Sequence, residues 1–90
     1  MTETVNQHYD VSHSLDPMFA DAARLVVETQ CGSASWLQRQ FEIGFNRANR
    51  LVEQLEAVGI IGADRGAKGR EVLIQDSNIL EQKLQELGFY

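Results

Sequence analysis

The stretch that decides the fold is FEIGFNRANRLVEQLEAVGII, residues 41–61. Its apolar residues recur every three or four positions, the period that places side chains on one side of an α-helix. This apolar stripe consists of Ala48, Leu51, Val52, Leu55 and Val58. We therefore expect a helix over about 45–58, closed by Gly59 just beyond its end, where glycine is favoured. A tight turn over 42–44 should precede it, with Gly44 free to take a positive φ.

The side of this helix opposite the stripe is polar. It holds Asn46, Asn49, Arg50, Glu53 and Gln54, with Arg47 on its flank. These side chains suit base edges in the major groove of DNA, because Arg can donate to guanine, Asn or Gln can bridge adenine, and Glu can accept from cytosine. They also lie toward the helix N-terminus, the end that meets the bases in helix-turn-helix docking. An ordinary solvated helix surface has a similar composition, so this face alone leaves both interpretations open.

Two helices are predicted before this one. Asp16-Pro17 favours a helix start, and the apolar residues that follow at helical spacing indicate a helix over about 17–29 that ends before Gly32. Ser33 and Ser35 are both candidate caps for a short second helix that contains Trp36, Leu37 and Phe41. Two short helices joined by a glycine-containing turn form the helix-turn-helix layout.

A β-hairpin and a last helix are predicted after it. Apolar runs at 60–61 and 72–74 flank a glycine-rich segment with three basic residues, Arg65, Lys68 and Arg70. These cations would neutralise phosphates, and Arg39 could anchor the second helix to the DNA backbone. A final amphipathic helix over about 78–87, capped by Asp76 or Ser77, could pack on the domain, pair two copies of the chain or stay loose.

These elements predict an α+β, mostly α fold: a winged helix-turn-helix of three helices plus a two-stranded hairpin wing, with an extra C-terminal helix. Residues 1–15 are expected to be a flexible arm, residues 16–76 the winged-helix domain and residues 77–90 the C-terminal helix. The net charge of −5 is unusual for a nucleic-acid binder. However, six of the eight basic residues lie in 39–70, which has a net charge of +2. Phosphate binding depends on this local field.

Several other classes of protein are disfavoured. No apolar run is long enough to span a membrane, and the N-terminus lacks the pattern of a signal peptide, so we expect a cytoplasmic protein. Cys31 is the only cysteine and lacks the partners of a thiol enzyme. His8 and His13 have no third ligand nearby and are expected to be solvated rather than bound to a metal. We expect no enzyme activity and no cofactor.

Over residues 16–74 the sequence resembles the gamma domain of the FtsK/SpoIIIE DNA translocases. The most specific stretches are SWLQRQ (35–40), IGFNRANRLVE (43–53), LEAVGIIG (55–62) and GAKGREVLI (66–74). The resemblance implies a winged helix that binds guanine-rich sequences in double-stranded DNA, several copies side by side, and contact with a translocase motor or a Xer-type recombinase. It implies base contacts for Asn46, Arg47 and Arg50, followed by Glu53 on the same face, and phosphate contacts for Lys68 and Arg70.

The chain departs from the family pattern at four points. Asn49 stands where alanine is usual, which puts the preferred base sequence in doubt, and Gly69 replaces a usual proline, which implies a looser wing. No ATP-binding glycine-lysine motif accompanies the domain, and residues 77–90 lie beyond the usual end. We expect a free-standing protein rather than an excised piece. Besides DNA binding, two functions stay open: a protein-interaction module that has lost DNA affinity, and a competitor for a translocase's partner surface.

Overall fold

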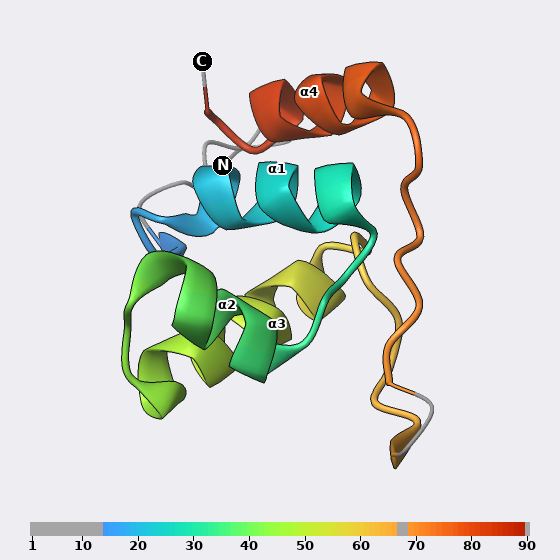
Figure 1. Cartoon of the computed structure of the whole chain (residues 1–90). Coiled ribbons are helices and arrows are strands. Elements are labelled where there is room, and N and C mark those ends of the chain that lie inside the picture. Colours follow the sequence, from blue (N-terminus) through green and yellow to red (C-terminus); the bar gives the residue numbers. More distant parts are fainter. Residues whose placement is uncertain (1–13, 67–68, 90) are drawn as a thin grey trace, which may run out of the picture.

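The computed structural model describes residues 14–66 and 69–89. Four helices follow one another in this part of the chain: α1 (Phe19–Thr29), α2 (Ala34–Phe41), α3 (Phe45–Ala57) and α4 (Ser77–Glu86). They form layers, with α4 lying along α1 and α1 lying over the pair α2 and α3 (Figure 1). The chain between α3 and α4 runs down one side of these layers and back. The structure is therefore small, compact and mostly helical.

The helices enclose one hydrophobic core. From α3 the core receives Ala48, Leu51, Val52 and Leu55, so the predicted apolar stripe is confirmed, with Val58 partly buried at its end. α1 contributes Phe19 and Val26, and α2 contributes Leu37. The predicted arm over residues 1–15 lies mostly outside the described residues; Leu15, which is described, packs against the core.

Side-chain caps begin two of the helices. The Ser33 hydroxyl accepts a hydrogen bond from the Trp36 backbone N–H at 3.1 Å, and the Asp76 carboxylate accepts one from the Asn78 N–H at 2.8 Å. Each cap satisfies an N–H that the first turn of a helix leaves without a backbone partner. Of the alternative caps suggested by the sequence, Ser33 and Asp76 are the ones used.

α1 begins two residues later than predicted. Asp16 accepts hydrogen bonds from the backbone N–H groups of Met18 and Phe19, each at 2.8 Å, and these bonds form a separate turn before the helix. The helix itself begins at Phe19. Asp16 thus lies in the entry turn of α1, where its carboxylate can also reach another helix.

The turn between α2 and α3 uses a different residue from the one predicted. Gly44 has a φ of −73°, whereas Glu42 has a φ of 54°. The prediction of a positive φ at Gly44 is therefore wrong. The chain changes direction at Glu42, which directly follows the last residue of α2. The backbone N–H of Glu42 donates a hydrogen bond to the Gln38 carbonyl. Gly59, with a φ of 86°, confirms the predicted glycine after α3.

The predicted two-stranded hairpin is not confirmed, because the structure contains no strand in its described part. What it contains is one antiparallel bridge between Ile61 and Val72. Two backbone bonds of 2.8 Å flank this bridge, from the Gly62 N–H to the Glu71 carbonyl and from the Leu73 N–H to the Ile60 carbonyl. We call the described residues 60–66 and 69–73, whose two ends run antiparallel at this bridge, the β-loop. Its pairing stays short because glycine-rich sequence weakens a strand.

α4 packs on α1, which is one of the three arrangements that the sequence left open. Leu80 and Leu84 are buried, and the rings of Phe19 and Phe89 stack with centroids 5.6 Å apart. Arg24 donates two hydrogen bonds to the Glu81 carboxylate, at 2.9 and 3.1 Å. No helix in the part of the chain that the structure describes combines the length and hydropathy of a membrane span.

Candidate nucleic-acid interface

The exposed side of α3 presents the side chains that sequence analysis assigned to base contacts. Asn46, Arg50 and Glu53 are exposed, and Asn49 is partly exposed beside them. We call these four residues the polar face. The Asn49 amide donates a long hydrogen bond of 3.4 Å to the Glu53 carboxylate. The side chains of Asn46 and Arg50 form no hydrogen bond within the described residues, so their donors are available to a ligand.

Arg47 is engaged with another part of the protein. Its Nε and Nη2 atoms donate to the two carboxylate oxygens of Asp16 at 2.9 and 2.8 Å. The Asp16 side chain is only 4% exposed, and the hydrogen bonds from Arg47 hold the pKa of its carboxyl below the usual value. These two bonds use two of the five guanidinium N–H donors and fix the direction in which the remaining three point.

Gln54 also faces Asp16. Its side-chain oxygen accepts a hydrogen bond from the Asp16 backbone N–H at 3.0 Å. Arg47 and Gln54 are seven residues apart, so they project within about 20° of each other on a helix. The helical projection placed Arg47 on the flank but counted Gln54 within the polar side, so it gave a signal only that Arg47 differs from Arg50. Their common partner, Asp16, lies 31 residues before Arg47 and 38 residues before Gln54 in the chain.

The β-loop holds its basic residues differently from the prediction. Arg70 donates to the Glu56 carboxylate at 2.7 Å and to the Gly62 carbonyl at 2.9 Å, and its side chain is only 16% exposed. Arg70 thus ties the β-loop to α3 instead of projecting into solvent. Arg65 is exposed and donates to the Gly69 carbonyl at 3.2 Å. The predicted phosphate contact Lys68 lies outside the described residues.

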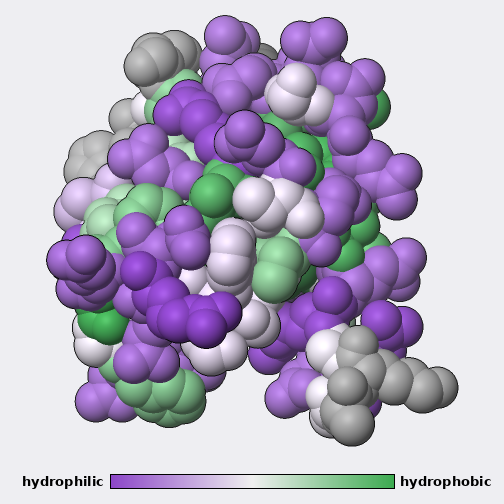
Figure 2. Space-filling model, in the orientation of Figure 1, coloured by the Kyte–Doolittle hydropathy of each residue, from purple (hydrophilic) through white to green (hydrophobic). Residues whose placement is uncertain are grey.

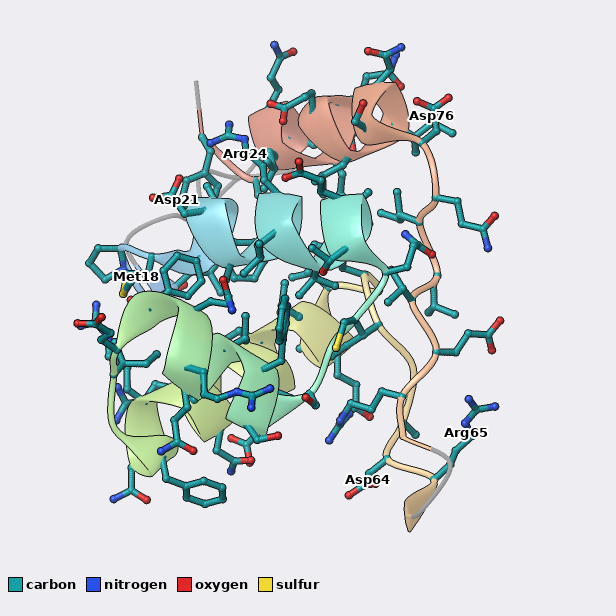
Figure 3. The ribbon with its side chains drawn as sticks, viewed as in Figure 1. Met18, Asp21, Arg24, Asp64, Arg65 and Asp76 are labelled. Carbon is teal, nitrogen blue, oxygen red and sulfur yellow. The ribbon has the colours of Figure 1, made fainter. Side chains whose placement is uncertain are left out.

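A shallow groove separates the β-loop from the helices. Its walls come from the start of α2, from α3 and from the β-loop, with lining residues that include Ser35, Phe45, Asn49, Asp64 and Arg70. The space-filling view shows the β-loop standing apart from the helical body (Figure 2). In Figure 3, Asp64 and Arg65 project to opposite sides of the β-loop.

Sequence analysis missed one exposed residue beside the polar face. Phe45, the first residue of α3, is 59% exposed and lines the groove. Its position one residue before Asn46 and outside the apolar stripe was the signal that could have identified it. An aromatic side chain here can contact a thymine methyl group or a sugar.

Arg39 lies on the last turn of α2 and is exposed. Its guanidinium carbon is 6.0 Å from the centroid of the Trp36 ring, at the outer limit of a cation–π contact. The described residues contain no group of three or more His, Cys, Asp or Glu side chains suited to a metal ion. His8 and His13 lie outside them.

Both sides of the molecule carry acidic and basic residues, with an acidic excess in the α1–α4 layer. The helices α1 and α4 contain Asp21, Glu28, Glu81 and Glu86 against Arg24 and Lys83. In α2, α3 and the β-loop, Arg39, Arg50 and Arg65 lie among acids such as Glu53 and Asp64. Figure 3 shows Asp21 and Asp76 on the α1–α4 side and Arg65 at the far end of the β-loop. A polyanion would therefore meet the exposed cations Arg39, Arg50 and Arg65 on the α3 side, among acidic neighbours such as Glu53 and Asp64.

Comparison with known proteins identifies similar sequences. Residues 13–75 match the family described as the Ftsk gamma domain. The chain is 47% identical over 75 residues to the DNA translocase FtsK of Streptococcus pneumoniae, a match that covers 83% of this chain and 10% of that protein. It is 50% identical over 72 residues to the DNA translocase FtsK of Chlorobaculum tepidum, covering 80% and 9%. The chain therefore spans only a small part of the curated relatives that it matches. The family match includes the polar face and the β-loop and ends before α4.

Proposed function

Because this chain belongs to the FtsK gamma-domain family, we propose that it binds double-stranded DNA and recognises base sequence through the polar face of α3. The observation that supports this most directly is the availability of Asn46 and Arg50 on a helix whose opposite side is buried. Arg50 can donate two hydrogen bonds to one guanine, which favours a guanine-rich target, and Asn46 can bridge an adenine. Glu53 can accept from a cytosine amine.

The β-loop is proposed to act as the wing of a winged helix. Its antiparallel contact at Ile61 and Val72 and its place directly after α3 support this assignment. Arg65 and Lys68 are the proposed phosphate contacts, with Arg39 as a further contact from α2. Arg70 is left out of this set because it is bonded to Glu56 and Gly62. With so few cations, affinity should depend mainly on base contacts.

In this proposal the chain is a binding domain without catalytic activity. By analogy with the relatives, which are DNA translocases, the bound DNA would orient or recruit a DNA translocase, with a Xer-type recombinase as a further candidate partner. Several copies could lie side by side on one DNA site, and binding to the chromosome would place the chain in the cytoplasm. If two copies associate through α4, Leu80 and Leu84 would not form the contact between them, because both side chains are already buried within one chain.

A second candidate function is a protein-interaction module on the same scaffold. The acidic α1–α4 layer favours it, because a net charge of −5 weakens non-specific attraction to DNA. The two functions differ in one measurable property, which is whether any duplex binds at low salt.

The test is selection of bound sequences from a randomised duplex library, followed by fluorescence anisotropy with the selected and a scrambled duplex at several salt concentrations. Arg50→Ala should weaken binding to the selected duplex by about 5- to 150-fold, the equivalent of one good bidentate base contact. Lys83→Ala on α4 is the matched control, since it removes the same charge from the opposite side. We expect it to change the affinity by less than about twofold. If no duplex binds the unaltered chain even at low salt, the protein-interaction module replaces the DNA-binding proposal.

A further inference from the structure

Asp16 is attached to α3 at two places. Its carboxylate accepts both hydrogen bonds from Arg47 in the first turn of α3, and its backbone N–H donates to Gln54 two turns later. Asp16 itself belongs to the entry turn of α1, through its bonds with Met18 and Phe19. These contacts join the start of α1 to one flank of α3. They oppose rotation of α3 about its own axis, and that rotation decides where the polar face points.

Arg50 lies between Arg47 and Gln54 on the same side of α3. It is three residues after Arg47 and four before Gln54, the spacings at which helical side chains are neighbours. Besides the hydrogen bonds from Arg47, the positive charge of Arg50 also contributes to the low pKa of the Asp16 carboxyl. Arg50 is therefore within electrostatic reach of a carboxylate that Arg47 already occupies.

Building on the proposed DNA-binding function, we infer that Arg47 is a positioning residue that occupies Asp16 and so leaves the Arg50 guanidinium free to contact a base. A buried carboxylate without a partner is strongly unfavourable, so it takes the nearest available cation. Without Arg47, that cation is Arg50. The polar face would then lose its main donor to guanine, although no residue of the face had been altered. Arg47 thus acts on DNA binding through Asp16 rather than through a contact with DNA.

The inference is tested by removing Arg47 and then its partner. With the duplex selected by the unaltered chain, Arg47→Ala should lower affinity by about tenfold or more, comparable to losing one bidentate base contact. Adding Asp16→Asn to Arg47→Ala should restore most of the affinity, because the neutral amide no longer attracts Arg50. If Arg47 contacts DNA directly, the double variant stays as weak as Arg47→Ala, and the inference is overturned.

A matched control separates this effect from a simple change in total charge. Asp21→Asn combined with Arg47→Ala gives the same net charge, but Asp21 lies exposed on α1, at 71% of its side-chain surface. This control should not restore affinity. Equal rescue by Asp16→Asn and Asp21→Asn would mean that net charge alone is responsible, which would also overturn the inference. Circular dichroism melts establish that each variant is folded at the assay temperature. Arg47→Met, which removes the charge but keeps a long side chain that can pack, replaces Arg47→Ala if the latter is unfolded.

A second measurement needs no DNA. In ¹⁵N-resolved NMR spectra, the Arg50 Nε–H resonance should shift and exchange more slowly with water in Arg47→Ala, and return to its original position when Asp16→Asn is added. An Arg50 resonance unaffected by Arg47→Ala would refute the inference. If the unaltered chain binds no duplex, the proposed function fails, while this spectrum still decides whether Arg47 keeps Arg50 away from Asp16.

Discussion

The packing of α4 on α1 predicts that Leu84 is one of the most sensitive positions in the chain. Leu84 is fully buried, while Ile79 on the same helix is 54% exposed. Replacing each with Ala removes a similar amount of aliphatic side chain from the same helix. The pair therefore separates the packing of α4 from its intrinsic helix stability.

The expected loss of stability in Leu84→Ala follows from the complete burial of this side chain. Leu84→Ala removes about three methylene equivalents at about 0.8 kcal/mol each, and the cavity adds to this loss, giving about 2–4 kcal/mol. A domain of this size has a free energy of unfolding of about 5–10 kcal/mol, so the variant should remain folded in water. With an m-value of about 1 kcal/mol/M, its urea midpoint should fall by about 2–4 M. Ile79→Ala should change stability by less than about 0.5 kcal/mol.

The assay is urea unfolding followed by circular dichroism and by the fluorescence of Trp36, the only tryptophan. The midpoint of the unaltered chain should also be the same at two protein concentrations, because Leu84 is buried within one chain. Equal losses for Leu84→Ala and Ile79→Ala would refute the packing of α4 on α1. A midpoint that rises with protein concentration would instead indicate that α4 pairs two copies.

Three further predictions concern single residues. Glu42→Gly should raise stability by about 1 kcal/mol, because Glu42 has a left-handed φ of 54° that disfavours side chains; an unchanged melting temperature would contradict this. Acidification should destabilise the chain: the pKa of Asp16 is lower folded than unfolded, so its stabilisation is complete above about pH 5 and is lost as pH falls through the folded value. The difference in free energy of unfolding between the unaltered chain and Asp16→Asn should therefore become smaller as the pH is lowered below about 5. If urea titrations show the same difference at every pH, the titration of Asp16 is not the cause of the acid destabilisation. Arg70→Ala should cost about 1 kcal/mol of stability and leave the salt dependence of DNA binding unchanged, whereas Arg65→Ala should reduce the log–log salt slope by about 0.9. The opposite pattern would show that Arg70, not Arg65, contacts phosphate.

Features that depend on neighbouring residues could be predicted from the sequence. The buried stripe of α3 follows from helical periodicity, since side chains such as Leu51 and Leu55 share one side whatever the rest of the chain does. The cap at Ser33 and the positive φ of Gly59 are likewise local, because each satisfies backbone groups only a few residues away. The exposure of Asn46 and Arg50 follows from the same periodicity.

Pairings between distant segments could not be predicted in this way. The partner of Arg47 lies 31 residues away and that of Arg70 lies 14 residues away, and periodicity holds no information about either. Sequence patterns therefore assigned all three arginines to DNA, Arg47 and Arg50 to bases and Arg70 to phosphate. The tertiary structure separates them into one that holds Asp16, one that is available on the polar face and one that ties the β-loop to α3.

The sequence by itself determined which helices form and which side of α3 is buried, because local hydrogen bonding and helical spacing dictate both. The tertiary structure decided that α4 covers α1 and which arginine of α3 stays free. Those outcomes depend on where separate segments meet in space. A buried carboxylate such as Asp16 must find its partner there, and that choice leaves Arg50 available to DNA.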